Sequence, residues 1–187
     1  MKIILFDFFG VISTPVYKIV IEKYLPEHEW SDWMKKLDIL DIGDMTENDL
    51  VESIAHKAGV QPDTIWQLVN VTPVVNDALL KYIDFQLSPH YQIGLLTNIP
   101  RSLLDRIIPD HIDKFDPLLV SSELRQIKPD PAIFTTAISR CNVAAHEILF
   151  IDDSVKNVEV ACSLGINGIV YQSLDQLKLS LFDVVAA

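Results

Sequence analysis

Three carboxylates, one hydroxyl and one ammonium group stand where they could act together on a phosphate ester. A carboxylate such as Asp7 can attack phosphorus and form an aspartyl phosphate, which splits hydrolysis into two steps. Thr97 can donate a hydrogen bond to a non-bridging oxygen, and Lys128 can supply a positive charge. Asp152 and Asp153 are adjacent acids that repel each other unless a cation compensates, and Mg²⁺ favours carboxylate ligands. Together these groups favour metal-assisted phosphoryl chemistry.

Five short apolar runs read as strands that are buried on both faces. They are Lys2 to Phe6, Gln92 to Leu96, Pro117 to Val120, Glu147 to Ile151, and Gly168 to Tyr171. Helical patterns separate several of them, so the sequence predicts an α/β fold: a doubly wound, five-stranded parallel sheet with helices on both faces. Ligands of such sheets collect outside the carboxyl ends of the strands. The five residues above end these runs or lie in the loop beyond.

A helical insertion divides this core after the first strand. Residues 14–87 contain amphipathic helical patterns and no convincing buried strand. We therefore predict an α/β core of residues 1–13 and 88–187 and a small helical cap of residues 14–87. Within the cap, Thr46 and Asp49 predict a helix N-cap, and Gly59 predicts the end of the same helix.

Composition and charge exclude several function classes. The chain has 187 residues, 49% of them hydrophobic, and a formal net charge of -11. No basic stripe interrupts this acidity, which argues against nucleic-acid binding. No apolar run approaches the roughly 18 residues that a membrane span needs, and Asp7 interrupts the apolar N-terminal run. Cys141 and Cys162 predict buried thiols in a reducing compartment. We expect a cytoplasmic protein with a small-molecule partner; the sequence does not indicate an oligomeric state.

The chemistry-bearing residues lie in four segments that resemble the four motifs of the haloacid dehalogenase-like (HAD) hydrolases, in the family's order. These are Asp7–Val11 (DFFGV), Leu95–Asn98 (LLTN), Lys128–Pro131 (KPDP) and Phe150–Ser154 (FIDDS), the last with Asn157. The resemblance covers nearly the whole chain outside the insertion. The insertion itself sits where this family places a helical cap. The resemblance implies a HAD-like Rossmannoid core and a hydrolase.

The resemblance also implies a role for each site residue. Asp7, Thr97 and Lys128 would be catalytic, with Asp7 as the nucleophile. Thr97, Asn98 and Lys128 would bind the phosphoryl group. The implied cofactor is Mg²⁺, held by Asp7, the backbone carbonyl of Phe9, Asp152 and Asp153; of the two adjacent acids, Asp153 would be the direct ligand. Asn157 would support these ligands from the following helix.

Two positions depart from the family pattern. Most phosphatases of the family carry a second Asp two residues after the nucleophile, where it protonates the leaving group and then activates water. Phe9 stands there and cannot transfer a proton, a loss that typically costs about 10² to 10⁴ in rate. Arg125 occupies a position where the family often has Gly, and we interpret it as a solvated arginine rather than a further cation in the pocket.

Phe9 leaves three functions open. The first is a Mg²⁺-dependent phosphatase for a small phosphorylated metabolite, which would favour aryl, acyl or anomeric phosphates because their leaving groups need little protonation. The second is a regulatory protein that binds phosphate and Mg²⁺ with weak turnover. The third is a 2-haloacid dehalogenase, which the retained pair Asp152 and Asp153 argues against. The bulky apolar residues of the cap are expected to serve packing rather than substrate binding; they are Trp30, Trp33, Met34 and Trp66.

Overall fold

The structure is a computed structural model that describes residues 1–186, with side chains as far as Phe182. The strands are β1 (Ile3–Phe6), β2 (Gln92–Thr97), β3 (Leu118–Val120), β4 (Ile148–Asp152) and β5 (Asn167–Val170). The helices are α1 (Val16–Tyr24), α2 (Trp30–Ile42), α3 (Glu47–Ala58), α4 (Pro62–Val71), α5 (Asp77–Tyr82), α6 (Arg101–Ile107), α7 (Ser121–Leu124), α8 (Pro131–Cys141), α9 (Val155–Ser163) and α10 (Leu174–Ala186). Short 3-10 segments are η1 (Glu27–Glu29), η3 (Ile112–Lys114) and η4 (Ala145–Glu147), and η2 (Ile83–Leu87) is a π-helical segment.

The five strands form one parallel sheet in the order β3-β2-β1-β4-β5, which confirms the predicted fold class. β1 is central, and its last residue, Phe6, lies beside Leu95 of β2 and Ile151 of β4. The residues that follow these three strands therefore meet at one edge of the sheet. This edge carries Asp7, Thr97 and Asp152.

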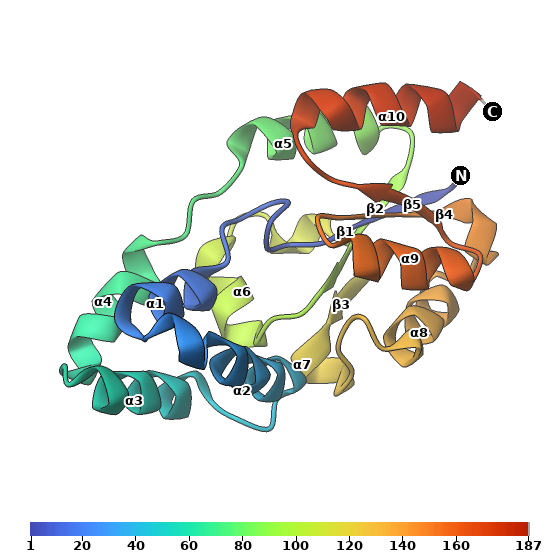
Figure 1. Cartoon of the computed structure of the whole chain (residues 1–187). Coiled ribbons are helices and arrows are strands. Elements are labelled where there is room, and N and C mark those ends of the chain that lie inside the picture. The colour runs from blue at the N-terminus through green and yellow to red at the C-terminus, as the bar shows by residue number, and fades with distance from the viewer. Residues whose placement is uncertain (187) are drawn as a thin grey trace.

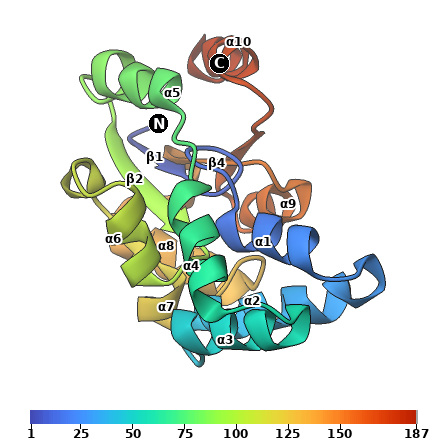
Figure 2. The same cartoon turned by 90° about the vertical axis from the view of Figure 1, so that its left-hand side faces the viewer.

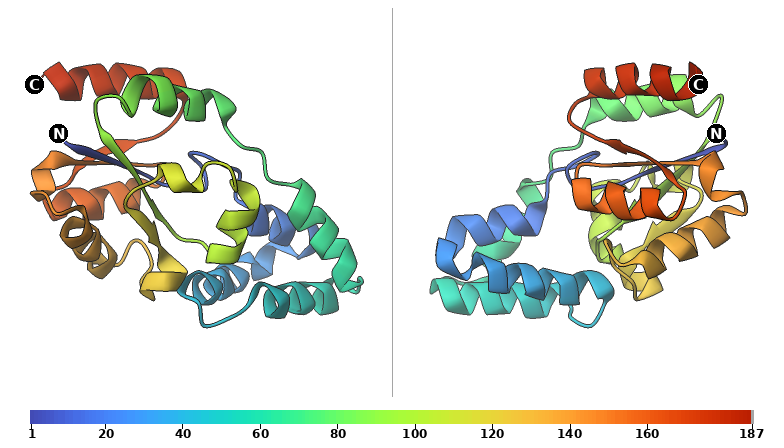
Figure 3. Two further views of the ribbon diagram at one scale, coloured as in Figure 1. Left: turned by 180° about the vertical axis from the view of Figure 1, so that it is seen from behind. Right: turned by 45° about the vertical axis from the view of Figure 1, so that its right-hand side comes forward.

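Alternate residues of β1 and β4 enter two separate hydrophobic layers. Figure 1 shows helices on both faces of the sheet. Ile4 and Phe6 of β1 pack into a layer that includes apolar residues of α5, α6 and α10. Ile3 and Leu5 pack into the other layer, with residues of α8 and α9. Figure 3 shows α10 above the sheet and α9 below it from two further sides. Burial on both faces explains why the strand sequences are continuously apolar.

Helices α1 to α4 pack against one another beyond the carboxyl ends of the strands, and we keep the name cap for this group (Figure 2). Thr46 Oγ1 accepts a hydrogen bond from the Asp49 backbone N–H, and Asp49 Oδ2 accepts one from the Thr46 backbone N–H. The predicted N-cap is therefore a complete capping box. Gly59 ends the same helix with φ +69°, as predicted. These caps fix where α3 starts and stops.

Two linkers join the cap to the core, and they are hydrogen-bonded to each other. Thr14 N–H donates to the Val74 carbonyl at 3.3 Å, and Val74 N–H donates to Thr14 Oγ1 at 3.1 Å. Asn76 N–H donates to the Ile12 carbonyl at 2.8 Å. The chain thus enters and leaves the cap side by side.

Residues 77–87, which the sequence assigned to the cap, lie beside α10 (Figure 1). Lys178 Nζ lies 5.6 Å from the centre of the Tyr82 ring, and Leu79, Leu80 and Ile83 belong to the hydrophobic layer of the sheet. The boundary at residue 87 stays a prediction, and these contacts favour an end of the cap near Asn76.

Two smaller expectations have different outcomes. Cys141 is buried as predicted, but Cys162 is exposed, so its predicted burial is wrong. It lies in the last turn of α9, where helical periodicity alone did not predict its exposure. Among the described helices, none has the length and apolar character needed to cross a bilayer.

Candidate active site

Lys128 joins the two carboxylates that follow β1 and end β4. Its Nζ lies 2.7 Å from Asp7 Oδ1 and 2.6 Å from Asp152 Oδ2. The lysine residue is 4% exposed and Asp152 is fully buried, so both ion pairs are shielded from water. Burial lowers the pKa of Lys128, but the charges of Asp7 and Asp152 outweigh it and raise that pKa overall. The ammonium therefore stays charged in the site.

The Asn98 side chain holds the loop that carries Lys128. Its Oδ1 accepts a hydrogen bond from Lys128 N–H at 2.8 Å, and its Nδ2 donates to the Lys128 carbonyl at 2.9 Å. Asp130 caps α8 immediately beyond, where its Oδ1 accepts from Ala132 N–H at 2.8 Å. The Asn98 side chain is thus engaged in positioning Lys128, and its direct contact with phosphate stays a prediction.

Asp152 is held by four hydrogen bonds. Its Oδ1 accepts from Ser154 N–H at 2.8 Å and from Asn157 Nδ2 at 3.1 Å. Its Oδ2 accepts from Asn157 Nδ2 at 3.0 Å and from Lys128 Nζ at 2.6 Å. Asn157 lies in the first turn of α9, one turn from the strand end, which lets its amide reach back to the carboxylate. This arrangement makes Asp152 a rigid anchor for Lys128.

One carboxylate oxygen of Asp7 and the Thr97 hydroxyl have no hydrogen-bond partner among the described residues. Asp7 Oδ1 accepts from Phe8 N–H at 2.7 Å and pairs with Lys128; among the described residues no partner contacts Oδ2. Thr97 is fully buried, and its Oγ1 has no hydrogen-bond partner in the described part of the chain. A buried hydroxyl without a hydrogen-bond partner costs free energy. Its presence here therefore favours a ligand that forms a hydrogen bond with Thr97 Oγ1.

A cluster of acidic oxygens fits a divalent cation. Asp7, Asp152 and Asp153 each offer a carboxylate oxygen, and these oxygens lie within 4.8 Å of one another. Burial and the Asp152 charge raise the pKa of Asp153, which Lys128 only partly offsets. Burial also raises the pKa of Asp7 against the opposing charge of Lys128. Hard oxygen donors with uncompensated negative charge suit Mg²⁺.

Phe9 places an apolar ring where a proton donor would be needed. It is half-buried, and its ring centre lies 5.3 Å from that of Phe8. Its carbonyl is a backbone atom, so the substitution leaves that predicted metal ligand available. The site therefore keeps its charge-bearing groups and lacks an acid at this position.

Asp41 of the cap is an ionisable residue near this site that the sequence did not disclose. It lies in the last turn of α2. Ser121 Oγ donates to its carbonyl at 2.6 Å and accepts from Ile99 N–H at 2.9 Å. Ser121 ends the third predicted strand run, and its hydroxyl ties the cap to the loop after β2. No sequence motif marks Asp41, because its place depends on how the cap closes.

Arg125 lies at the surface, as interpreted from the sequence. Its side chain is 63% exposed and pairs with Asp44 of the cap. Its φ of +53° lies in the left-handed region, which glycine adopts without strain. This backbone conformation gives a physical reason for the glycine that the resemblance implies at this position.

The cap aromatics serve packing. Trp33 is buried in the hydrophobic core, and Trp30, Met34 and Trp66 pack against it. Trp66 lies over Arg106 of α6, with 5.7 Å between the guanidinium carbon and the ring centre. Glu47 of α3 pairs with the same arginine at 2.7 Å, so this face joins cap to core.

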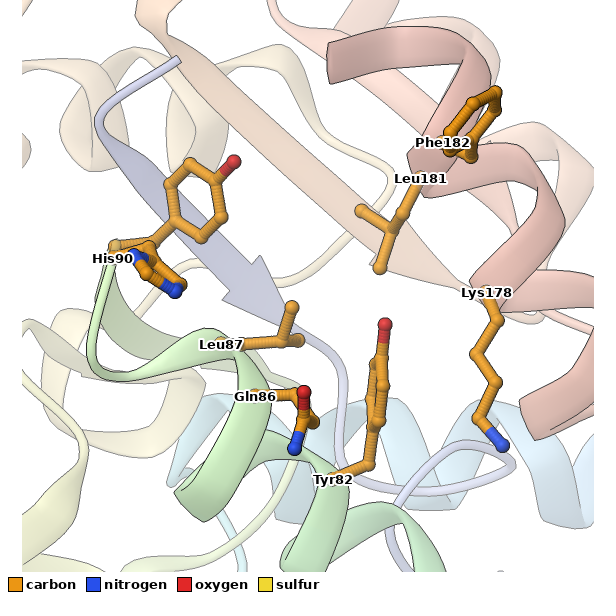
Figure 4. A pocket seen from close by; sticks show the side chains of 8 residues that line it. Tyr82, Gln86, Leu87, His90, Lys178, Leu181 and Phe182 are labelled. Atoms are coloured by element: carbon orange, nitrogen blue, oxygen red, sulfur yellow. The ribbon is translucent and has the colours of Figure 1, made fainter. Parts of the chain in front are cut away.

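A pocket of about 340 Å³ lies elsewhere, between η2 and α10 (Figure 4). Its lining includes Tyr82, Leu87, His90, Lys178 and Phe182. None of the predicted site residues lines it. The predicted site residues lie instead at the carboxyl ends of the strands.

Comparisons with known proteins agree with this geometry. A family model for haloacid dehalogenase-like hydrolases matches residues 1–165. The chain is 28% identical over 205 aligned residues to a phosphorylated carbohydrates phosphatase from Thermotoga maritima, with 97% of this chain and 90% of that protein covered.

Solved structures share the fold. A HAD family enzyme from Bacteroides thetaiotaomicron, in complex with magnesium and inorganic phosphate, superimposes with a TM-score of 0.75 at 21% identity, covering 95% of this chain and 98% of that chain. A predicted HAD-like family hydrolase from Porphyromonas gingivalis gives a TM-score of 0.77 at 20% identity, covering 100% and 98%. With the family match over most of its length, this chain belongs to the haloacid dehalogenase-like hydrolases.

Proposed function

We propose that this chain is a Mg²⁺-dependent phosphatase that hydrolyses a small phosphorylated metabolite through an aspartyl phosphate on Asp7. The observation that carries the proposal is the buried Lys128 ammonium, which contacts the Asp7 nucleophile and its Asp152 anchor at 2.7 Å and 2.6 Å. The Thermotoga maritima relative, named a phosphatase of phosphorylated carbohydrates, supports the substrate class.

The chain's own residues account for substrate binding and attack. Lys128 attracts the phosphoryl group and offsets its charge, and Thr97 Oγ1 donates a hydrogen bond to a non-bridging oxygen. Asp7 attacks phosphorus through Oδ2, because Phe8 N–H and Lys128 Nζ both contact the other oxygen, Oδ1. Water then attacks the aspartyl phosphate and releases inorganic phosphate and the Asp7 carboxylate.

The acidic cluster would hold the cation. Asp7, Asp153 and the Phe9 carbonyl are the proposed direct ligands, because all four hydrogen bonds of Asp152 are already made within the protein. Mg²⁺ bound there would neutralise negative charge on the phosphoryl oxygens. It would also let an anionic substrate enter a protein whose formal net charge is -11.

A phosphatase panel with and without Mg²⁺ tests this proposal. Aryl, sugar and alkyl phosphates are incubated with the wild type, Asp7→Asn and the matched surface control Asp175→Asn, whose side chain is 94% exposed. We expect turnover that needs Mg²⁺, is lost in Asp7→Asn and is kept in the control. Turnover that survives Asp7→Asn would remove the nucleophile. Thermal stabilisation by phosphate and Mg²⁺ without product would favour the binding protein instead.

A further inference from the structure

The cap brings one carboxylate to the site from a different part of the chain. Asp41 lies in the last turn of α2, and Figure 1 shows that end of α2 beside α7. The hydrogen bonds from Ser121 to the Asp41 carbonyl and from Ile99 to Ser121 fix this end of the helix to the loop after Thr97. The backbone of Asp41 is therefore anchored to the strand ends.

The Asp41 carboxylate is left without a partner among the described residues. It is half-buried, and no hydrogen bond or ion pair among the described residues uses its carboxylate. The charges of Asp7 and Lys128 both act on it, together with that of Asp38 one turn earlier on α2. Burial, Asp38 and Asp7 raise the pKa of Asp41 to about 8, and Lys128 opposes them. A carboxyl group that keeps its proton near neutral pH can act as a general acid.

We propose that Asp41 is the catalytic acid and base that Phe9 cannot be, supplied by the cap instead of by the nucleophile loop. The proposal rests on the phosphatase function above. When Asp7 Oδ2 bonds to phosphorus and the bond from phosphorus to the leaving oxygen breaks, the Asp41 carboxyl gives its proton to that oxygen. The products are an alcohol, the aspartyl phosphate and the Asp41 carboxylate.

The second step restores both aspartates. The Asp41 carboxylate takes a proton from water as the water oxygen bonds to phosphorus, and the bond between phosphorus and Asp7 Oδ2 breaks. Inorganic phosphate leaves, Asp7 is again a carboxylate and Asp41 is again protonated. An acid on the cap also extends the substrate class, because alkyl phosphates with poor leaving groups become substrates beside the activated phosphates.

Kinetics on two leaving groups test the assignment. The wild type, Asp41→Asn and Asp32→Asn, a control at a 79% exposed side chain of the same helix, are assayed with Mg²⁺ on p-nitrophenyl phosphate and on a simple alkyl phosphate. For Asp41→Asn we expect kcat/KM on the alkyl phosphate to fall by about 10² or more, with much less change on the aryl phosphate. On the aryl phosphate kcat should fall, with a burst of nitrophenolate as aspartyl phosphate accumulates. Asp32→Asn should keep both activities within a few-fold.

The outcomes separate this inference from the function on which it rests. Equal losses on both substrates, or no burst, in a variant that keeps the wild-type melting temperature would overturn the role of Asp41 and leave the phosphatase standing. The same holds for a wild type that turns over only the aryl phosphate. A wild type inactive on both substrates would overturn the phosphatase and the role of Asp41 together.

Discussion

Gly10 lies so close to Asp153 that no side chain fits between them. A Cβ atom added at Gly10 would lie 2.2 Å from Asp153 Oδ2, and Gly10 has φ +84°. The first motif thus needs glycine both for its turn and for the approach of the proposed metal ligand. The backbone of one motif sets the position of a carboxylate that belongs to another.

Gly10→Ala is therefore expected to weaken Mg²⁺ binding by about 10- to 100-fold, because the Asp153 carboxylate must move. Isothermal titration calorimetry with Mg²⁺ measures the change. Gly59→Ala is the matched control, since Gly59 also has positive φ, +69°, but has no atom within 4 Å of an added Cβ. It should lower the free energy of unfolding by about 1 kcal/mol and leave Mg²⁺ affinity unchanged. Equal affinities in both variants would contradict the steric argument.

Lys128→Met is expected to lower the free energy of unfolding by about 3–5 kcal/mol in the absence of Mg²⁺, because it leaves two buried carboxylates without their cation. Urea denaturation measures the loss. Lys156→Met, at an exposed lysine of α9, should change stability by less than about 0.5 kcal/mol.

A double variant tests the cause of that loss. Adding Asp7→Asn to Lys128→Met removes one of the stranded charges, so part of the stability should return. Strictly additive losses would argue against an ionic origin.

Glu47→Gln is expected to lower the free energy of unfolding by about 1.5–3 kcal/mol at pH 7, because Glu47 accepts hydrogen bonds from Arg106, Ser102 and Tyr17. Although burial raises the pKa of Glu47, those bonds lower it below its usual 4.5. The stabilisation is therefore present above pH 4.5 and is lost as the pH falls through the folded-state pKa. The free energies of unfolding of the wild type and Glu47→Gln should converge at acidic pH. Glu52→Gln, on the exposed side of α3, should have the same free energy of unfolding as the wild type at every pH.

The pH profile provides a separate check on Asp41. A general acid works only while protonated, so kcat/KM on an alkyl phosphate should fall as the pH rises past the pKa of Asp41, about 8 in the protein without a bound cation. Asp41→Asn should lack this alkaline decrease in kcat/KM, Asp32→Asn should retain it, and Asp38→Asn should shift it to lower pH because the Asp38 charge helps to raise the pKa of Asp41. If kcat/KM of Asp41→Asn decreases at alkaline pH as in the wild type, another group causes the decrease.

Arg125→Gly is expected to be more stable than Arg125→Ala by about 1 kcal/mol, because both lose the exposed pair with Asp44 but only glycine adopts φ +53° without strain. Thermal denaturation of the two variants side by side measures the difference. Equal melting temperatures would show that the loop relaxes.

Much of the site could be predicted because each group ends a buried strand or lies just beyond one. Asp7, Thr97 and Asp152 follow apolar runs, and parallel strands bring such ends to one edge of a sheet. The sequence did not disclose which partner each side chain would take. The contact of Asn98 with phosphate stays a prediction, and the sequence did not disclose that its side chain holds the backbone of Lys128.

Asp41 and residues 77–87 were harder for a different reason. Helical periodicity shows which face of a helix is apolar, but not which neighbour covers that face. The role of Asp41 depends on contacts between the cap and the strand ends, and the position of α5 depends on α10, which lies almost a hundred residues later. Long-range packing of this kind leaves no local pattern in the sequence.

The paired linkers at Thr14 and Val74 set how the cap can move. Because the chain crosses between cap and core at one place, the cap can swing about that crossing while the sheet stays unchanged. Such a swing would carry Asp41 away, whereas Asp7, Thr97 and Lys128 would remain on the sheet. In an enzyme of this design, alkyl phosphates could phosphorylate Asp7, and water could be activated to hydrolyse the aspartyl phosphate, only while the cap holds Asp41 at the strand ends.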